Sequence, residues 1–436
     1  MGTRGSTARP ALDDTSVPVV VLKLARNPVH HGAVGIVRSL GRLGVEVHTV
    51  RQSRWEPIRL SRYDAGGFVC DHVALDDEEI VARLLAWSER LDRRPVLVPI
   101  DDKSLILVEE HGDELAEGYV FSRRPAGLAR DLSNKRRLYE LCLEHGMPAP
   151  ETTFPADERE VREIAEDAVF PIVVKRVDYF AREERRGDKM AIVHDRDELL
   201  TAFDAMRSFP EPGLMLQEYL PGGADSVWMF DGYFDASSRC LFGVTGQKLR
   251  QHPVDTGVAT LAVCRDNEFV RGAAAEVLGR LGYTGIVDLG FRYDARDGRY
   301  KLLDVNPRVG CTFRLFVDSN GTDVVEAMYR DLTGQAVPVG APVEGRRWIV
   351  ENYDCVSAAA LVAQRRLQLR EWLRSLRGVA EGAWFALDDP LPFLGMVVSS
   401  AGAARTRALG SLRRRKATPA PIAEAAPEPP VSTLRP

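Results

Sequence analysis

The chain has 436 residues, of which 45% are hydrophobic and 28% are charged, so it can bury a core and is too long for one ordinary domain. Its formal net charge of -5 gives no overall positive field, which argues against nucleic acid as a partner. The polar N-terminus, six scattered cysteines and absence of a long apolar run predict a cytoplasmic protein without stable membrane insertion, disulfides or a zinc site.

Residues 17–130 alternate short apolar strands with amphipathic helices. The segments VPVVVLKL, VEVHTV and RPVLVPI favour strands, and AVGIVRSLGRLG favours a helix between the first two. This alternation predicts an α/β domain with a parallel, Rossmann-like sheet, preceded by a disordered tail over residues 1–16.

Residues 131–337 carry a more polar mixture of strands and helices, which predicts an α+β region. The segment SNKRRLYELCLEHG favours a helix that Ser133 caps and that Gly146 ends. Two further helices are predicted over DRDELLTAFDAMRS and NEFVRGAAAEVLGRLG, each with Asp or Asn at its cap position.

A lysine ends one strand of this region. The segment FPIVVKR places Lys175 before a charged loop, DYFAREERRGDKM, which contains Lys189. A strand-end lysine can bind phosphates where a closing loop excludes water. Taken alone, Lys175 would more often be an ordinary surface lysine.

The next strand, LMLQEYLPGGADSVWMF, breaks at two glycines. Its side chains and backbone could hydrogen-bond an adenine edge and a ribose hydroxyl, although ordinary strand and turn residues would give the same pattern. The candidate contacts are Gln217, Glu218, Tyr219, Leu220 and Asp225.

A basic segment, TGQKLRQHP, follows. Lys248 and Arg250 alternate with Leu249, so they are expected to project to one side of an extended segment. They could hold a γ-phosphate or a substrate carboxylate. A solvated basic strand face explains the pattern equally well.

The segments GIVDLGFRY and RYKLLDVNPR read as a hairpin joined by a DARDG turn. Asp304 and Asn306 share one face of the second strand. If the turn centres on Arg296, Asp288 lies directly opposite Asp304, and two carboxylates and an amide oxygen converge. Such an oxygen set suits Mg²⁺ shared with phosphates, and Arg308 could grip a carboxylate or phosphate beside it. The alternative is a hairpin with solvated acids.

The remaining chain divides in two. Residues 338–404 contain the helical stretch VSAAALVAQRRLQLREWLRSLRG and the run DDPLPFLGMVV, which suit a small C-terminal domain. Residues 405–436 are basic and then Pro/Ala-rich, which predicts a disordered tail. The basic part could meet an acidic partner or a membrane surface, but a solvated tail is the simpler interpretation.

In this order, the motifs resemble the ATP-grasp superfamily. They are Asn134-Lys135 at a helix start, a strand ending in Lys175, QEYLPG with a following acid, Asp288, and Asp304-x-Asn306-Pro-Arg308. The segments RSLGRLGVEV, QKLRQHP and DDPLPF resemble a bacterial branch of predicted carboxylate-amine ligases that includes relatives of D-aspartate ligase. The likeness covers about residues 17–400.

The resemblance implies a pre-ATP-grasp domain over residues 17–130 and a two-lobed ATP-grasp core over 131–337. It also implies one or two Mg²⁺ ions, replaceable by Mn²⁺, on the hairpin residues. ATP phosphates would be bound by Lys135, Lys175 and Lys189, and adenosine by the segment from Gln217 to Asp225. Two features depart from the family: Asp304 replaces the usual Glu, and Ile286 stands where D-alanine-D-alanine ligases have an arginine.

These features predict an enzyme that forms an amide bond between an amino acid-like carboxylate and an amine through an acyl phosphate. Arg308, Lys248 and Arg250 would be its catalytic residues, and a homodimer is compatible with the sequence. One alternative is activation of bicarbonate on the same core, as in carboxylases. Another is a nucleotide-binding regulatory protein that has lost its chemistry.

Overall fold

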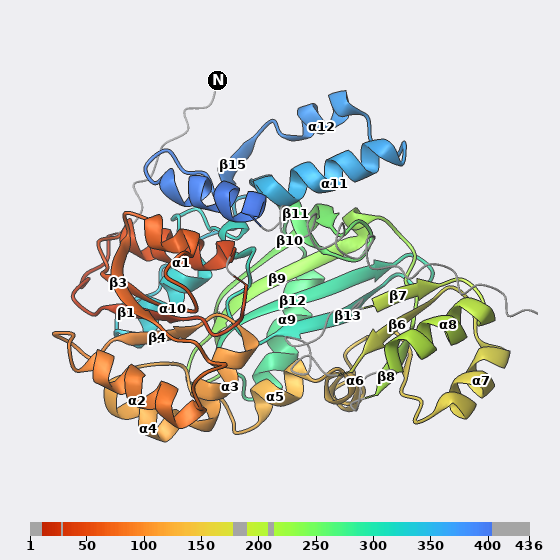
Figure 1. Ribbon diagram of the computed structural model, residues 1–436, viewed down its shortest axis with the longest axis horizontal. Helices are drawn as coiled ribbons and strands as arrows, with labels where there is room; N and C mark the ends of the chain where they lie inside the picture. The colour runs from red at the N-terminus through yellow and green to blue at the C-terminus, as the bar shows by residue number, and fades with distance from the viewer. Residues whose placement is uncertain (1–10, 28, 178–189, 208–212, 403–436) are drawn as a thin grey trace, which may run out of the picture.

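The computed structural model describes residues 11–27, 29–177, 190–207 and 213–402, which form three β-sheets surrounded by helices (Figure 1). Lys189 and the tail from residue 405 onwards lie outside the described residues, as does most of the loop that precedes Met190. Among the described helices, none combines the length and hydrophobicity needed to cross a bilayer.

The first sheet has four parallel strands in the order β3-β2-β1-β4. Helices cover both of its faces, which explains why β1 and β4 are apolar at every position. The predicted parallel α/β opening is therefore confirmed. Its elements are β1 (Val19–Leu22), α1 (His31–Gly41), β2 (Val47–Arg51), η1 (Pro57–Leu60), β3 (Asp64–Val69), α2 (Asp77–Ser88), β4 (Val96–Pro99), α3 (Asp102–Glu110) and α4 (Gly112–Gly118).

A second, antiparallel sheet stands apart at the right of Figure 1, with its own small core. The strands run in the order β5-β8-β6-β7, and α7 and α8 pack against each other and on this sheet. The elements are β5 (Thr152–Thr153), α7 (Glu158–Asp167), β6 (Ile172–Arg176), β7 (Met190–Val193), α8 (Arg196–Arg207) and β8 (Leu214–Glu218).

The third sheet has seven strands in the order β13-β12-β9-β10-β11-β14-β15 and lies between the other two parts (Figure 1). Its last two strands come from the segment expected to form a separate C-terminal domain, so that segment completes the central sheet. The strands are β9 (Val227–Phe234), β10 (Cys240–His252), β11 (Val258–Cys264), β12 (Gly285–Asp294), β13 (Arg299–Asn306), β14 (Arg347–Ile349) and β15 (Val379–Gly382).

The helices around this sheet differ from the sequence prediction in two details. Asn134, not Ser133, caps α6 by accepting hydrogen bonds from the backbone of the first turn, because Ser133 already ends α5. The long C-terminal helical stretch is two helices. The elements are α5 (Leu128–Ser133), α6 (Lys135–Glu144), η3 (Ala224–Ser226), α9 (Glu268–Arg280), η4 (Phe313–Leu315), α10 (Val324–Leu332), α11 (Glu351–Ala363), α12 (Leu369–Ser375) and a last helix over 391–402.

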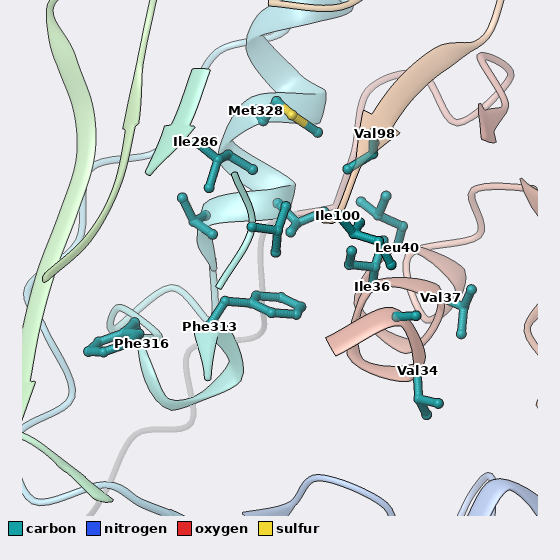
Figure 2. Close-up of a cluster of buried hydrophobic side chains, with 14 of the residues drawn as sticks. Val34, Ile36, Val37, Leu40, Val98, Ile100, Ile286, Phe313, Phe316 and Met328 are labelled. Carbon is teal, nitrogen blue, oxygen red and sulfur yellow. The ribbon is translucent and has the colours of Figure 1, made fainter. Parts of the chain in front are cut away.

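The two faces of the seven-stranded sheet enter different cores. One face buries Val287, Leu289 and Phe291 against α5, α6 and α9. The other face packs against α1, α10 and η4 in a core shared with the first sheet. Figure 2 shows Phe313 of this shared core between Ile286 of the central sheet and the side chains of α1. The shared core fixes the first sheet against the polar edge of the third.

Candidate functional site

The β12–β13 hairpin carries the predicted oxygen ligands in a different register from the expected one. Asp288 lies opposite Asn306, and Asp304 lies opposite Gly290, so the expected pairing of Asp288 with Asp304 is wrong. The pairing is already one residue off the expected centre at the turn, where Asp294 lies opposite Arg299, and an irregularity between Gly290 and Phe291 shifts the ladder by one more residue. The three polar residues still share one face of the sheet.

Two of these side chains contact each other, and the third contacts a lysine. The Asn306 amide donates a hydrogen bond of 3.3 Å to the Asp288 carboxylate, and the Lys135 ammonium contacts the Asp304 carboxylate. Burial raises the pKa of Asp288 to about 6, and the negative charge of Asp304 acts in the same direction. Although burial opposes ionisation of Asp304, Lys135 holds the pKa of that carboxyl below its usual range.

Lys175 approaches this hairpin from the second sheet. Its ammonium donates a 2.7 Å hydrogen bond to Gln217 on the neighbouring strand β8. Burial and the positive charge of Lys135 together lower the pKa of Lys175 to about 8, while Asp304 opposes the change. The first turn of α6 is also tied to this sheet, because the Lys135 amide donates to the Val177 carbonyl at 3.4 Å. Two lysines from different elements therefore flank one carboxylate.

Lys248 reaches the same face from β10. In the sheet, Val244 lies opposite Asp231, and Asp231 lies opposite Asp288, so the three side chains share one face. Lys248 follows Val244 by an even number of residues, which places its side chain on that face as well. Its ammonium donates to the Gly257 carbonyl at 3.0 Å. Burial lowers the pKa of Lys248 to about 8, while Asp288 and Asp304 oppose that shift. Lys248 thus lies close to the acidic pair.

Arg250 does not join Lys248, contrary to the expectation from alternation. The β10–β11 ladder is irregular on both sides of Arg250. Its guanidinium forms a bidentate pair with the Asp354 carboxylate at 2.8 and 2.9 Å and donates to Ser375 at 2.7 Å. Arg250 therefore fastens β10 to α11 and α12, and the structure does not bring it to the candidate site.

The predicted nucleotide-contacting segment follows β8. Gln217 is buried and held by Lys175 and Thr152, whereas the Glu218 carboxylate is ion-paired with Arg296 and Lys301. The chain leaves the sheet after Glu218. The backbone groups of Tyr219 and Leu220 thus lie beyond the strand ladder, and Leu220 itself is buried. The Asp225 side chain is exposed, and its carbonyl accepts a hydrogen bond from Gln247.

Arg308 links the hairpin to the first sheet. Its Nε donates a 2.9 Å hydrogen bond to Asp102, and its Nη2 donates a 3.3 Å bond to the Asn306 side chain. Asp102 opens α3 directly after β4, at the carboxyl end of the parallel sheet, where ligands commonly bind in such folds. Sequence reasoning missed Asp102, although two acids after a predicted strand were a signal for it.

Asp231 was also missed, although a lone acid in the apolar strand VWMFDGYF is a visible signal. It is fully buried beside Asp288. Among the described residues, neither of its carboxyl oxygens has a hydrogen-bond partner. Burial raises its pKa well above the usual range, and the charges of Asp288 and Asp323 add to that effect. A neutral carboxyl beside Asp288 is compatible with these surroundings.

The loop that follows β13 packs closely against the side chain of Asp288. A Cβ atom at Gly310 would lie 2.7 Å from the carboxyl carbon of Asp288, so no side chain fits there. The next residue, Cys311, has its sulfur 3.6 Å from Nε2 of His30, which caps α1 through a hydrogen bond from Ala33. The first turn of α1 therefore packs directly on this loop.

The residue chemistry fits a magnesium ion better than a softer metal. Two carboxylates and one amide oxygen are hard oxygen donors of the kind that Mg²⁺ prefers, and the lysines beside them suit phosphate oxygens. Within the part of the chain that the structure describes, no group of three or more His, Cys, Asp or Glu side chains is arranged to hold a metal. A magnesium ion at this position would therefore need the Asn306 side chain as a ligand beside the two carboxylates, with further ligands from phosphate oxygens.

Comparison with known proteins gives sequence and structural relatives. D-aspartate ligase of Enterococcus faecium (strain Aus0004) is 25% identical over 248 residues, which are 55% of this chain and 59% of that protein. No protein-family model matches the chain. The chain thus spans less than two thirds of the length of this relative.

Solved structures share the fold. The biotin carboxylase domain of Hydrogenobacter thermophilus 2-oxoglutarate carboxylase, solved with MgADP and bicarbonate, aligns with a TM-score of 0.54 and 16% identity over 74% of this chain and 71% of that one. The L-amino acid ligase from Bacillus licheniformis aligns with a TM-score of 0.54 and 14% identity over 76% of each chain. At such identities the likeness concerns the fold alone.

Proposed function

We propose that this chain, which has the ATP-grasp fold and resembles D-aspartate ligase in sequence, is an ATP- and Mg²⁺-dependent ligase that joins a carboxylate to an amine. One observation carries the proposal. An oxygen donor set on one face of the hairpin meets ammonium groups from two other elements, Lys135 and Lys175, so ligands for a cation and for phosphates converge. The similarity to D-aspartate ligase supports the ligase class.

The lysines would bind the phosphate oxygens of ATP, and the backbone beyond Glu218 would meet the adenine edge. Positioning and charge stabilisation are the main contributions that a protein makes to phosphoryl transfer. Asp288, Asp304 and Asn306 are the residues that would hold magnesium, which, when bound, would neutralise charge on the phosphates.

The reaction would have two steps. First, an oxygen of the substrate carboxylate attacks the γ-phosphorus of ATP, the bond to the β-phosphate oxygen breaks, and ADP leaves. Then the amine nitrogen attacks the acyl carbon, inorganic phosphate leaves, and the amine loses a proton. Arg308 and Lys248 would orient the carboxylate and stabilise the developing oxyanion, whereas Arg250, which pairs with Asp354, is not assigned to these steps.

A second candidate function is the activation of bicarbonate in place of another carboxylate. The fold shared with a biotin carboxylase domain that was solved with bicarbonate supports it. Release of ADP that needs bicarbonate and no amino acid would favour this candidate. A protein that only senses nucleotide would bind ATP without releasing ADP in any substrate mixture.

The test is a screen of amino acids and dipeptides for ADP and phosphate release with Mg-ATP, with products identified by mass spectrometry. Asp304→Asn should lower substrate-dependent ADP release by at least about a hundredfold, because it removes a carboxylate oxygen and the negative charge that faces Lys135 and a bound cation. Asp297→Asn is the matched control, since Asp297 lies in the turn of the same hairpin and pairs with Lys301. Equal rates for both variants and the native chain would refute the assignment of the hairpin.

A further inference from the structure

The last described helix, over 391–402, exposes an apolar stripe. Its inner side buries Met396 in the core shared with the first sheet, and the partly buried Phe393 packs against the same core. Leu391, Leu394 and Val398 recur at helical spacing on the outer side, and Val398 exposes 72% of its surface. Exposed leucines and valines in one row are unusual unless something covers them.

Helix α12 also exposes apolar side chains, and the residues in and around it carry a strong positive charge. None of its residues is buried, and Leu369 and Leu373, one turn apart, are both exposed. Residues 364–378 contain a single acid, Glu371, among several exposed cations. These cations are Arg365, Arg370, Arg374 and Arg377, together with Arg366, which is ion-paired with Asp255.

Both helices lie in the layer along the top of Figure 1, away from the β12–β13 hairpin. We call their exposed residues, Leu369, Leu373, Leu391, Leu394 and Val398 with the arginines of 364–378, the C-terminal surface. The chain beyond residue 402 continues with AARTRALGSLRRRK, which has six cations and no acid. Positive charge is therefore concentrated in the part of the sequence that contains these apolar rows.

The positive charge of the C-terminal surface distinguishes between the partners that could bind it. A second copy docking through a two-fold axis would place this basic surface against itself, which brings like charges together. The chain's own tail is basic as well, so it would also be repelled. Nucleic acid would satisfy the arginines but would leave the leucines and valines in water.

We propose that the C-terminal surface binds an anionic lipid bilayer from its aqueous side. The apolar rows would enter the interface between headgroups and acyl chains, and the arginines would pair with lipid phosphates. Exposed apolar side chains on helices that lie beside several cations are the combination that binds at a membrane interface. This proposal is independent of the ligase proposal, because it uses no residue of the candidate site.

The test is cosedimentation of the full chain with phosphatidylcholine vesicles that contain or lack phosphatidylglycerol. Binding is expected only with the anionic lipid and should weaken as salt is raised. Leu394→Ser with Val398→Ser, and separately Arg370→Gln with Arg374→Gln, should each weaken binding by about tenfold. Leu143→Ser on α6 is the matched control, since Leu143 exposes 64% of its surface elsewhere on the molecule, against 55% for Leu394.

Several results would overturn the proposal. Absence of binding to phosphatidylglycerol vesicles at low salt is one, and equal binding to soluble polyglutamate is another, because it would indicate an acidic polymer as partner. Dependence on residues 403–436 without any effect of the helix variants would assign binding to the tail. A native dimer, seen by light scattering, that the leucine variants dissociate would assign this surface to a second copy.

Discussion

Lysines with lowered pKa values are the main chemical signature of the site. Lys175 and Lys248 each have a pKa of about 8 because burial disfavours their charged forms. A phosphate beside them would favour the charged form, so nucleotide binding should take up protons in weakly alkaline solution. The direction follows from the charge: the lysines are protonated below pH 8 and lose their attraction for phosphate above it.

We therefore predict that ADP affinity falls as pH rises through about 8, by at most about tenfold per pH unit for each proton involved. Titration calorimetry across this range measures the slope. Lys175→Arg should flatten the slope, because arginine stays charged. Lys301→Arg serves as the control, since Asp294 raises the pKa of Lys301 although burial opposes it. An unchanged slope in Lys175→Arg would remove Lys175 from the phosphate site.

At the scale of elements, strand irregularities decide which residues meet. The break in the β10 ladder places Arg250 against Asp354 rather than beside Lys248. Asp354 is fully buried and also accepts hydrogen bonds from Thr260 and Trp372. One carboxylate on α11 therefore joins β10, β11 and α12, which identifies the Arg250–Asp354 pair as a structural contact.

Arg250→Met should destabilise the fold by about 3–5 kcal/mol, because it leaves a buried carboxylate without its cation. ADP affinity measured well below the unfolding temperature should stay unchanged. Urea unfolding and calorimetry test the two parts separately. Arg366→Met breaks the exposed pair with Asp255 and should cost at most about 1 kcal/mol. Loss of ADP release in Arg250→Met at native stability would restore Arg250 to the site.

The sequence predicted the parallel first sheet and the hairpin of acids, because alternation and turn residues are local signals. The ladder shift beside Gly290 was not predicted, because Leu302 and Leu303 are both apolar and their spacing does not show which of them faces the core. Asp231 and Asp102 were missed for another reason. Their importance arises from neighbours far apart in the chain, Asp288 and Arg308 respectively, and only the tertiary arrangement brings these pairs together.

On the scale of the whole molecule, one core spans two of the three sheets. Phe313 is fully buried, and Cβ at Gly35 of α1 would lie 2.9 Å from its ring. Figure 2 shows it near Ile286 as well. The antiparallel sheet around β6 has a separate core that includes Phe203. The first and third sheets should therefore unfold together, and the second can open by itself.

Phe313→Ala should cost about 3–5 kcal/mol and increase hydrogen exchange in both β1 and β12, because the cavity lies in their common core. Phe203→Ala, a matched truncation, should increase exchange only in the second sheet. Exchange followed by mass spectrometry distinguishes these outcomes. Protection that is lost from β12 but kept in β1 would show that the first sheet folds independently of the shared core.

Close packing around Gly310 has a mechanical consequence. From His30 through Cys311 and Gly310 to Asp288, each neighbour touches the next, and the step at Gly310 has no side chain that could bend to absorb a displacement. A molecule that displaces the start of α1 would therefore also displace the Asp288 side chain, because closely packed groups transmit strain. A ligand beside the start of that helix would therefore be expected to alter the position of Asp288 within the proposed magnesium site.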